Sequence, residues 1–290
     1  MKIKVSEKGN KVIIKGAGGF NLRHTLDCGQ VFRFTETPAG SFIVVAGSRV
    51  IELCQRGDEI VIENSSIDEF YNVWENYFDL RRDYKKIQAL VNKDDIINTA
   101  SRYGDGIRIL AQEPFECLIS FIISQRNAIP NIKRVIERIC EKYGEVIGEY
   151  KGKIYHAFPT PEQLNRAKIE DLNALKCGYR SEYIINAANR VHSGEADLAK
   201  LYSMDSAGQK STLMEFRGVG QKIAECVMLF AYSNFDVFPP DTWIIKAMND
   251  FYNVPQNNID EFSASYFGGY RGLAQQYLFF YRRNFKENGE

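Results

Sequence analysis

Residues 213–244 read LMEFRGVGQKIAECVMLFAYSNFDVFPPDTWI and contain the most informative turn of the chain. We predict a helix that ends at 216–217, a tight turn, and a second helix over 221–232, because glycine tolerates the positive φ that a sharp reversal requires. The turn consists of Gly218, Val219 and Gly220. Such a turn directs backbone amides outward at a helix N-terminus, where they suit an anion such as a phosphate.

Lys222 stands in the first turn of the second predicted helix. A partly desolvated ammonium beside the positive end of a helix dipole has its charged form disfavoured, so we expect a more nucleophilic amine. The alternative is a solvated surface lysine, which is the usual situation. Asp241 follows Pro239 and Pro240 and is expected to cap the next helix. One carboxylate can serve both as a cap and in catalysis.

The spacing of these residues resembles a known signature. Gly-Val-Gly followed by Lys222, then Cys226 after an acidic residue, then Pro-x-Asp ending at Asp241, is similar to the helix-hairpin-helix signature of base-excision DNA glycosylases with lyase activity, specifically the 8-oxoguanine DNA glycosylases. Further segments lie in the order of that family: 26–30 (LDCGQ), 77–80 (YFDL), 106–110 (GIRIL), 112–118 (QEPFECL), 120–122 (SFI), 274–275 (AQ) and 278–279 (LF). The resemblance covers nearly the whole chain.

Composition places limits on the class of protein. The 37 basic and 37 acidic residues of the 290 cancel, so DNA affinity has to come from local clustering and specific side chains. The six cysteines contain no C-x-x-C pair, so we expect neither a zinc site nor an iron–sulfur cluster, and free thiols fit a reducing compartment. The sequence shows no apolar run of the ~18 residues that a membrane span needs and no signal peptide. We therefore expect an intracellular monomer, cytoplasmic or nucleoid-associated if bacterial, without a membrane partner.

The hydrophobic pattern predicts an α+β protein. Five short runs at strand spacing, separated by glycine-rich turns, predict an antiparallel meander over 11–14, 31–34, 42–45, 50–53 and 60–63. After Asn64 the spacing becomes helical, and almost everything beyond it is expected to be helix. We predict an antiparallel β-sheet domain with a helical tail over 1–94. The helical helix-hairpin-helix glycosylase region, in two lobes, is predicted over 95–290.

Two polar loops are candidates for DNA contact. Arg126 and Asn127 belong to a Ser-Gln-Arg-Asn loop between two predicted helices, and Tyr179 and Arg180 follow a glycine at a second tip. The ordinary interpretation of the second tip is a helix-capping glycine followed by a packed tyrosine. The resemblance instead implies that Tyr179 is a wedge that enters the duplex beside the extruded base and that Arg180 reads the orphaned partner. Base extrusion requires such a filler, because unstacking costs a few kcal/mol.

Four residues are candidates for binding the base. Gly29 lies where a strand is expected to begin, so it is either a bulge or turn glycine, or, as the resemblance implies, a lesion sensor whose carbonyl accepts the N7 proton of the oxidised guanine. Gln275 and Phe279 lie one helical turn apart. They are either core residues, or a pair in which Phe279 stacks on the base and Gln275 binds its edge. The resemblance places the flipped base between Cys226 and Phe279, with Gln275 on its N1 and N2 edge.

The resemblance also implies a mechanism. Unprotonated Lys222 attacks the deoxyribose C1′, displaces the oxidised base, and forms a Schiff base whose β-elimination nicks the strand. Asp241 stabilises positive charge on the sugar and holds the lysine in place. No cofactor and no catalytic metal are expected. Main-chain carbonyls of Met214, Phe216 and Val219 would hold a loosely bound monovalent cation that bridges to double-stranded DNA containing oxidised guanine.

The sequence departs from the eukaryotic members of the resembled family at two places. Arg126, Asn127, Ala128 and Asn131 stand where those members carry an asparagine run and a downstream arginine that read the opposite cytosine. We therefore predict weak discrimination for cytosine. Trp243 stands in place of a histidine, so one phosphate contact is expected to be lost or replaced.

Two other functions remain open at this point. A monofunctional alkyl-base glycosylase needs the aspartate but has no need of Lys222. A non-catalytic helix-hairpin-helix module would use only the glycine turn to grip phosphates. A P-loop is excluded because no Gly-Lys-Ser/Thr sequence follows Gly220.

Overall fold

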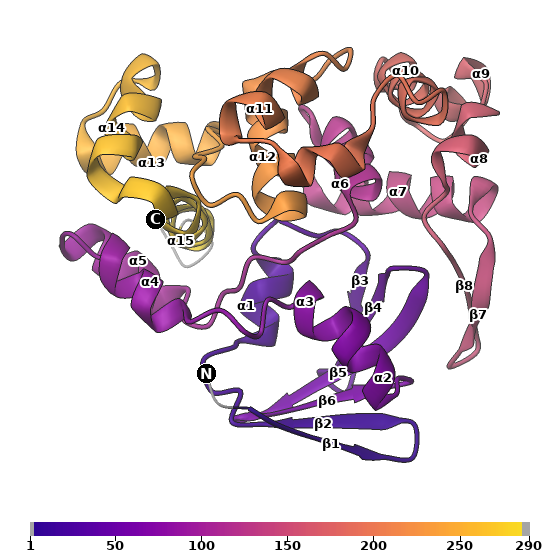
Figure 1. The fold of residues 1–290 in the computed structure, drawn as a ribbon, viewed down its shortest axis with the longest axis horizontal. Coiled ribbons are helices and arrows are strands. Elements are labelled where there is room, and N and C mark those ends of the chain that lie inside the picture. Colours follow the sequence, from indigo (N-terminus) through magenta and orange to yellow (C-terminus); the bar gives the residue numbers. More distant parts are fainter. Residues whose placement is uncertain (1–2, 286–290) are drawn as a thin grey trace.

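The N-terminal part is a six-stranded antiparallel sheet in the order β1-β2-β6-β5-β4-β3 (Figure 1). The computed structural model describes residues 3–285. The strands are β1 (Lys4–Lys8), β2 (Lys11–Lys15), β3 (Phe34–Glu36), β4 (Phe42–Ala46), β5 (Arg49–Arg56) and β6 (Glu59–Glu63). Val12 and Ile14 of β2 alternate with exposed lysines and face the core beside Ile60 and Ile62 of the neighbouring strand. The predicted antiparallel sheet and the α+β class are confirmed. The predicted meander is wrong for the sheet as a whole, because β2 pairs with β6 and, of the predicted strands, only β3 to β6 follow one another as neighbours.

The strand predicted over 31–34 is wrong in position. Residues 22–27 form helix α1 (Leu22–Asp27), whose N-cap Asn21 accepts a hydrogen bond from His24 N at 3.0 Å. Val31 and Phe32 are buried outside any strand, and β3 begins only at Phe34. Because this segment is covered on both sides, its continuous apolar run looks like a strand. Gly29 therefore follows a helix instead of opening a strand.

Helices make up most of the chain after residue 66. They are α2 (Ile67–Glu69), the π-turn η1 (Phe70–Trp74), α3 (Glu75–Tyr77), α4 (Tyr84–Val91), α5 (Asp95–Tyr103), α6 (Pro114–Ser124), α7 (Ile129–Tyr143), α8 (Pro161–Asn165), α9 (Ile169–Ala174), α10 (Arg180–His192), η2 (Leu198–Ser203), α11 (Ser206–Met214), α12 (Gln221–Tyr232), α13 (Thr242–Tyr252), η3 (Gln256–Asn258), α14 (Ile259–Phe267), η4 (Gly268–Tyr270) and α15 (Arg271–Phe285). The apolar α6 lies at the centre of the helical part, in contact with α7, α10 and α12.

A β-hairpin interrupts the helices where we expected none. It consists of β7 (Val146–Tyr150) and β8 (Lys153–His156), and it projects beside the larger sheet (Figure 1). The Tyr150 hydroxyl donates a hydrogen bond to Glu52 of β5 at 2.8 Å. The exposed apolar side chains of Val146 and Ile154 blur the alternation by which such a strand is recognised.

The C-terminal helix α15 joins the two parts of the molecule. It packs on α5 and α13, while Gln276 donates a hydrogen bond to the carbonyl of Cys28, just after α1. Arg283 forms an ion pair with Asp27 at 3.0 Å. The predicted division into residues 1–94 and 95–290 stays a prediction. Within residues 3–285, no helix is long and apolar enough to cross a bilayer.

Candidate active site

The hairpin between α11 and α12 has the predicted glycine turn. α12 covers 221–232 as expected, whereas α11 ends at Met214, two residues before the predicted end at 216. Gly218 has a φ of +80°, and a β-carbon there would lie 2.3 Å from Cδ2 of Tyr183 in α10. Both the backbone conformation and the lack of space therefore require glycine.

The amides of the turn are only partly free to bind an anion. The N–H of Val219 donates to the carbonyl of Phe216 at 3.0 Å. Those of Ile223 and Ala224 both donate to the carbonyl of Gly220, the N-cap of α12. The first N–H groups of a helix lack partners within the helix. The amides of Gly220 and Gln221 make no hydrogen bond within the described residues, so they are free to bind an anion, and the predicted DNA contact of the turn stays a prediction.

Lys222 lies where the hairpin, α6 and α13 meet. Its side chain is half-buried, and its ammonium is 5.3 Å from the centroid of the Phe121 ring. The positive charge of Lys222 acts to lower the pKa of both Asp241 and Cys226, which shows that the three side chains share one region. Phe121 in turn stacks on Phe230 at 5.4 Å, so the floor beneath the lysine is rigid and apolar.

Asp241 is the N-cap of α13, as expected from the sequence. Its Oδ1 accepts a hydrogen bond from the N–H of Ile244 at 2.8 Å. Burial raises the pKa of the Asp241 carboxyl, and this effect outweighs the opposing influence of the Ile244 amide and the Lys222 charge. The carboxylate is thus fixed by a helix and held close to the lysine in a poorly solvated place.

The predicted base-binding residues come from three parts of the chain: the loop after α1, helix α12 and helix α15. Cys226 of α12 is 4% exposed, and burial raises the pKa of its thiol to about 11. Gly29 has a φ of +80°, and a β-carbon there would lie 3.0 Å from Cε1 of Phe279 in α15. Gln275 is 5% exposed, and its Oε1 has no hydrogen-bond partner among the described residues. The structure thus brings Gly29 and Phe279 into contact and leaves an unsatisfied acceptor on the same helix.

The two predicted DNA-contacting tips lie together. Nε of Arg180 donates to the carbonyl of Gln125 at 3.0 Å, and its Nη2 lies 3.3 Å from the carbonyl of Arg126. Tyr179, 51% exposed, is the N-cap of α10, with its hydroxyl directed at the same Gln125 carbonyl. Arg126 has a φ of +46°, and Asn127 accepts a hydrogen bond from Asn131 at 2.8 Å. The exposed side chains of Tyr179 and Arg126 thus lie on neighbouring loops that Arg180 links by hydrogen bonds.

Sequence reasoning assigned no role to two residues near the hairpin. Tyr183 packs under Gly218, and its only signal is a second tyrosine one turn after Tyr179. Glu225 is 2% exposed and pairs with Lys210 of α11 at 2.7 Å, while Gln221 donates to the same oxygen at 2.9 Å. This buried pair ties the two helices of the hairpin together. An acidic residue inside an apolar helix was the available signal.

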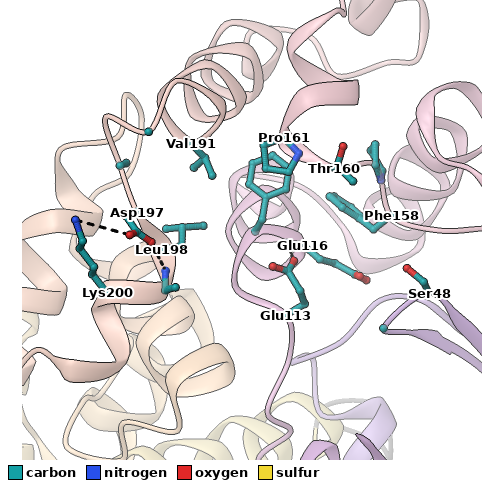
Figure 2. A pocket seen from close by; sticks show the side chains of 16 residues that line it. Ser48, Glu113, Glu116, Phe158, Thr160, Pro161, Val191, Asp197, Leu198 and Lys200 are labelled. Carbon is teal, nitrogen blue, oxygen red and sulfur yellow. Dashed lines mark hydrogen bonds and ion pairs between the residues drawn. The ribbon is translucent and has the colours of Figure 1, made fainter. Parts of the chain in front are cut away.

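A cavity of about 460 Å³ lies elsewhere, between the start of α6, the loop before α8 and the segment leading into η2 (Figure 2). Its lining combines apolar side chains such as Phe158 with the acidic Glu113 and Glu116. Burial raises the pKa of Glu116 to about 7. None of the predicted site residues lines this cavity. Among residues 3–285, no cluster of histidine, cysteine and acidic side chains is arranged to hold a metal ion.

Comparisons with known proteins agree with this geometry. Residues 12–118 match the model of the 8-oxoguanine DNA glycosylase N-terminal domain, and residues 119–265 match that of the HhH-GPD superfamily of base excision DNA repair proteins. The chain is 30% identical to a probable N-glycosylase/DNA lyase of Methanothermobacter thermautotrophicus over 72% of this chain and 73% of that protein.

Solved structures resemble the whole fold. The Clostridium acetobutylicum 8-oxoguanine glycosylase/lyase, in complex with double-stranded DNA containing cytosine opposite 8-oxoguanine, superposes with a TM-score of 0.95 at 40% identity, covering 98% of each chain. MBOgg1 in complex with a low-affinity DNA ligand superposes with a TM-score of 0.96 at 42% identity, covering 99% of this chain and 100% of that one.

Proposed function

We propose that Lys222 and Asp241 perform the chemistry of this chain, which belongs to the 8-oxoguanine DNA glycosylases of the HhH-GPD superfamily. The chain is a glycosylase with AP lyase activity on 8-oxoguanine in duplex DNA. The observation that carries the proposal is the shared location of Lys222, Asp241 and Cys226 beside the glycine turn. A half-buried amine over an apolar ring is favoured as a nucleophile, and a fixed carboxylate beside it can stabilise positive charge that develops on the sugar.

The reaction proceeds in two stages. The unprotonated Lys222 amine attacks C1′ of the deoxyribose, the bond from C1′ to N9 breaks, and the base departs with the bonding electron pair. The amine gives one proton to the departing base. The bond from C1′ to O4′ then breaks, O4′ takes up a proton from solvent, and the nitrogen lone pair forms the Schiff base. Loss of a C2′ proton to solvent, with breakage of the bond from C3′ to oxygen and departure of the 3′ phosphate, nicks the strand. Asp241 stabilises the positive charge that develops on the sugar.

The recognition of the base follows from the four residues that we propose to surround it: Gly29, Cys226, Gln275 and Phe279. The Oε1 atom of Gln275 is a buried acceptor without a partner among residues 3–285, and the N1–H and N2–H groups of 8-oxoguanine are donors. The carbonyl of Gly29 faces the N7 proton that only the oxidised base carries. Phe279 and Cys226 stack on the two faces of the ring. Tyr179 fills the space that the base leaves, and Arg180 contacts the orphaned partner.

The carbonyls of Met214, Phe216 and Val219 form the proposed site for a monovalent cation. Oxygen donors of this kind suit a hard cation. The Phe216 carbonyl already accepts a hydrogen bond from Val219, which leaves it one lone pair for the ion. The cation would attract a DNA phosphate electrostatically, and no chemical step depends on it.

The protein acts on DNA inside the cell, and we place it in the cytoplasm or on the nucleoid if its source is bacterial. We expect it to act as a monomer and without a cofactor.

Borohydride trapping tests the proposed nucleophile. Duplex DNA containing 8-oxoguanine is incubated with the wild type, with Lys222→Gln, and with Lys246→Gln as a matched control at an exposed lysine of α13. We expect a covalent adduct from the wild type and the control but none from Lys222→Gln. Equal trapping by all three proteins refutes the role of Lys222. Excision without an adduct from the wild type indicates a monofunctional glycosylase, and DNA binding without excision indicates a non-catalytic module.

A further inference from the structure

The contacts of α10 point to a positioning role for Tyr183. We propose that Tyr183 couples the insertion of Tyr179 into DNA to the alignment of Lys222, so that the amine is correctly placed only when the wedge is seated. The proposal rests on the function proposed above and adds a residue that touches neither the base nor the sugar.

The first half of the coupling is the contact between α10 and the glycine turn. The Tyr183 ring lies against Gly218 so closely that an added β-carbon would be 2.3 Å from Cδ2 and 2.6 Å from Cε2. Arg217 is held at the same place, because its N–H donates to Asn186 Oδ1 at 3.1 Å and its guanidinium pairs with Glu182 at 2.8 Å. Three neighbouring side chains of α10 therefore fix the entry to the turn.

The second half is the contact between the two tyrosines. The rings of Tyr179 and Tyr183 meet edge to face, with centroids 5.9 Å apart and planes at 77°. Tyr179 is also covered by the Arg180 guanidinium at 4.6 Å from its ring centroid. The proposed coupling requires that the Tyr179 ring turn away from these contacts when it enters the base stack. Insertion of Tyr179 therefore changes the surroundings of Tyr183.

A change around Tyr183 is transmitted to Lys222 through the glycine turn and the start of α12. The turn that rests on Tyr183 continues directly into α12, whose first turn carries the lysine. Glu225 and Lys210 tie α12 to α11, so a shift of the turn moves the start of the helix as a unit. A displacement of ~1 Å at a reacting group lowers a rate by up to ~100-fold. Tyr183 is thus placed to make the chemistry depend on the state of the wedge.

The test separates base extrusion from chemistry. A 2-aminopurine placed beside 8-oxoguanine reports extrusion by its fluorescence, and single-turnover excision reports chemistry. The variants are Tyr183→Ala, Tyr183→Leu, Tyr183→Phe, Tyr179→Ala and the double variant of Tyr179→Ala with Tyr183→Ala. Tyr71→Ala is the control, since Tyr71 is another exposed aromatic that lies in η1, outside the site. Thermal melting identifies any variant that fails to fold, and the leucine variant then replaces the alanine variant.

We expect Tyr183→Ala to extrude the base like the wild type but to excise it about tenfold to 100-fold more slowly. Tyr183→Phe keeps the ring and is expected to restore the rate to within about twofold. Tyr179→Ala is expected to lose extrusion. Adding Tyr183→Ala to this variant is expected to slow excision by less than about twofold more, because the effects of coupled residues are not additive.

Three results overturn the proposal. These are loss of extrusion in Tyr183→Ala, a wild-type excision rate in Tyr183→Ala, and single-variant effects that multiply in the double variant. Borohydride trapping by the wild-type protein is measured in the same series. If the wild type is trapped on DNA and Tyr183→Ala gives one of these results, only the coupling is refuted. If the wild type is never trapped, the proposed function is refuted.

Discussion

Gly29 and Phe279 lie in direct contact, although 250 positions separate them in the sequence. A β-carbon on Gly29 would be 3.0 Å from Cε1 and 3.1 Å from Cζ of the phenyl ring. One edge of the Phe279 ring therefore packs on the backbone of Gly29, the residue that we propose as the lesion sensor. The ring position and the direction of the Gly29 carbonyl depend on each other.

Replacing Gly29 with alanine is expected to impair recognition more than folding. The added methyl displaces the Phe279 ring, so single-turnover excision of 8-oxoguanine is expected to fall by roughly tenfold or more. Gly40→Ala is the matched control, because Gly40 has a φ of +77° but nothing within 4 Å of an added β-carbon. Both variants carry the backbone strain of ~1–3 kcal/mol, visible in thermal melting. A wild-type rate in Gly29→Ala, or an equal loss in the control, contradicts the prediction.

The pH dependence of excision is expected to reveal Asp241. Because burial raises the pKa of its carboxyl, the ionised form is lost at a higher pH than for an ordinary aspartate, and the rate falls as the pH drops through that raised value. Asp241→Asn keeps a capping side chain and is expected to lower the rate at least ~100-fold, without this acidic limb. The measurement is single-turnover excision as a function of pH.

Stability is expected to change in the opposite direction at Asp241. With a folded-state pKa above the unfolded value, the contribution of this group is present at low pH and is lost as the pH rises through the folded pKa. Asp241→Asn removes the buried charge, so its melting temperature at neutral pH is expected to equal or exceed that of the wild type. A clear drop in melting temperature would show that the charged cap stabilises the fold.

Neighbouring glutamines of α15 offer a paired test. Gln275 carries a buried Oε1 that has no hydrogen-bond partner within residues 3–285, so Gln275→Met is expected to raise stability by up to ~1–3 kcal/mol while weakening binding to 8-oxoguanine. Gln276 donates to the carbonyl of Cys28, so Gln276→Met is expected to lower stability. Thermal melting and DNA binding measure both. If Gln275→Met destabilises the protein as much as Gln276→Met, the first side chain has a structural function instead.

The base opposite the lesion is expected to matter little. Asn131 stands where the eukaryotic members carry the downstream arginine, and it donates a hydrogen bond to Asn127. Arg180, which we place against the orphaned partner, also donates to the carbonyl of Gln125, which limits its freedom to select one base. We expect excision rates opposite cytosine, adenine, guanine and thymine to agree within about tenfold, which is no more than the discrimination of one good base contact. Asn131→Arg is expected to increase the preference for cytosine. A strong cytosine requirement in the wild type contradicts this prediction.

The elements that could be predicted from sequence are those with a local cause. The glycine turn and α12 follow from backbone freedom and apolar spacing, and Asp241 was recognised as a cap from its place before an apolar run. β2 and β6 were found because their exposed and buried residues alternate.

The elements that were missed depend on contacts between distant residues. The setting of Gly29 is defined by α1 and α15 together, and an apolar run covered from two sides does not distinguish a strand from a buried loop. The contact of Tyr183 with Gly218 joins α10 to the hairpin and leaves no periodic signal. The β7–β8 hairpin exposes apolar side chains, which hides its two faces.

The burial of Cys226 has a consequence for the reactivity of its thiol under oxidative stress. With a thiol pKa of about 11, roughly one molecule in ten thousand carries the thiolate at pH 7. Peroxides react with the thiolate and not with the thiol, so this sulfur is chemically quiet. Oxidising conditions that damage guanine are therefore expected to leave this side chain, which we place against the extruded base, in its reduced form.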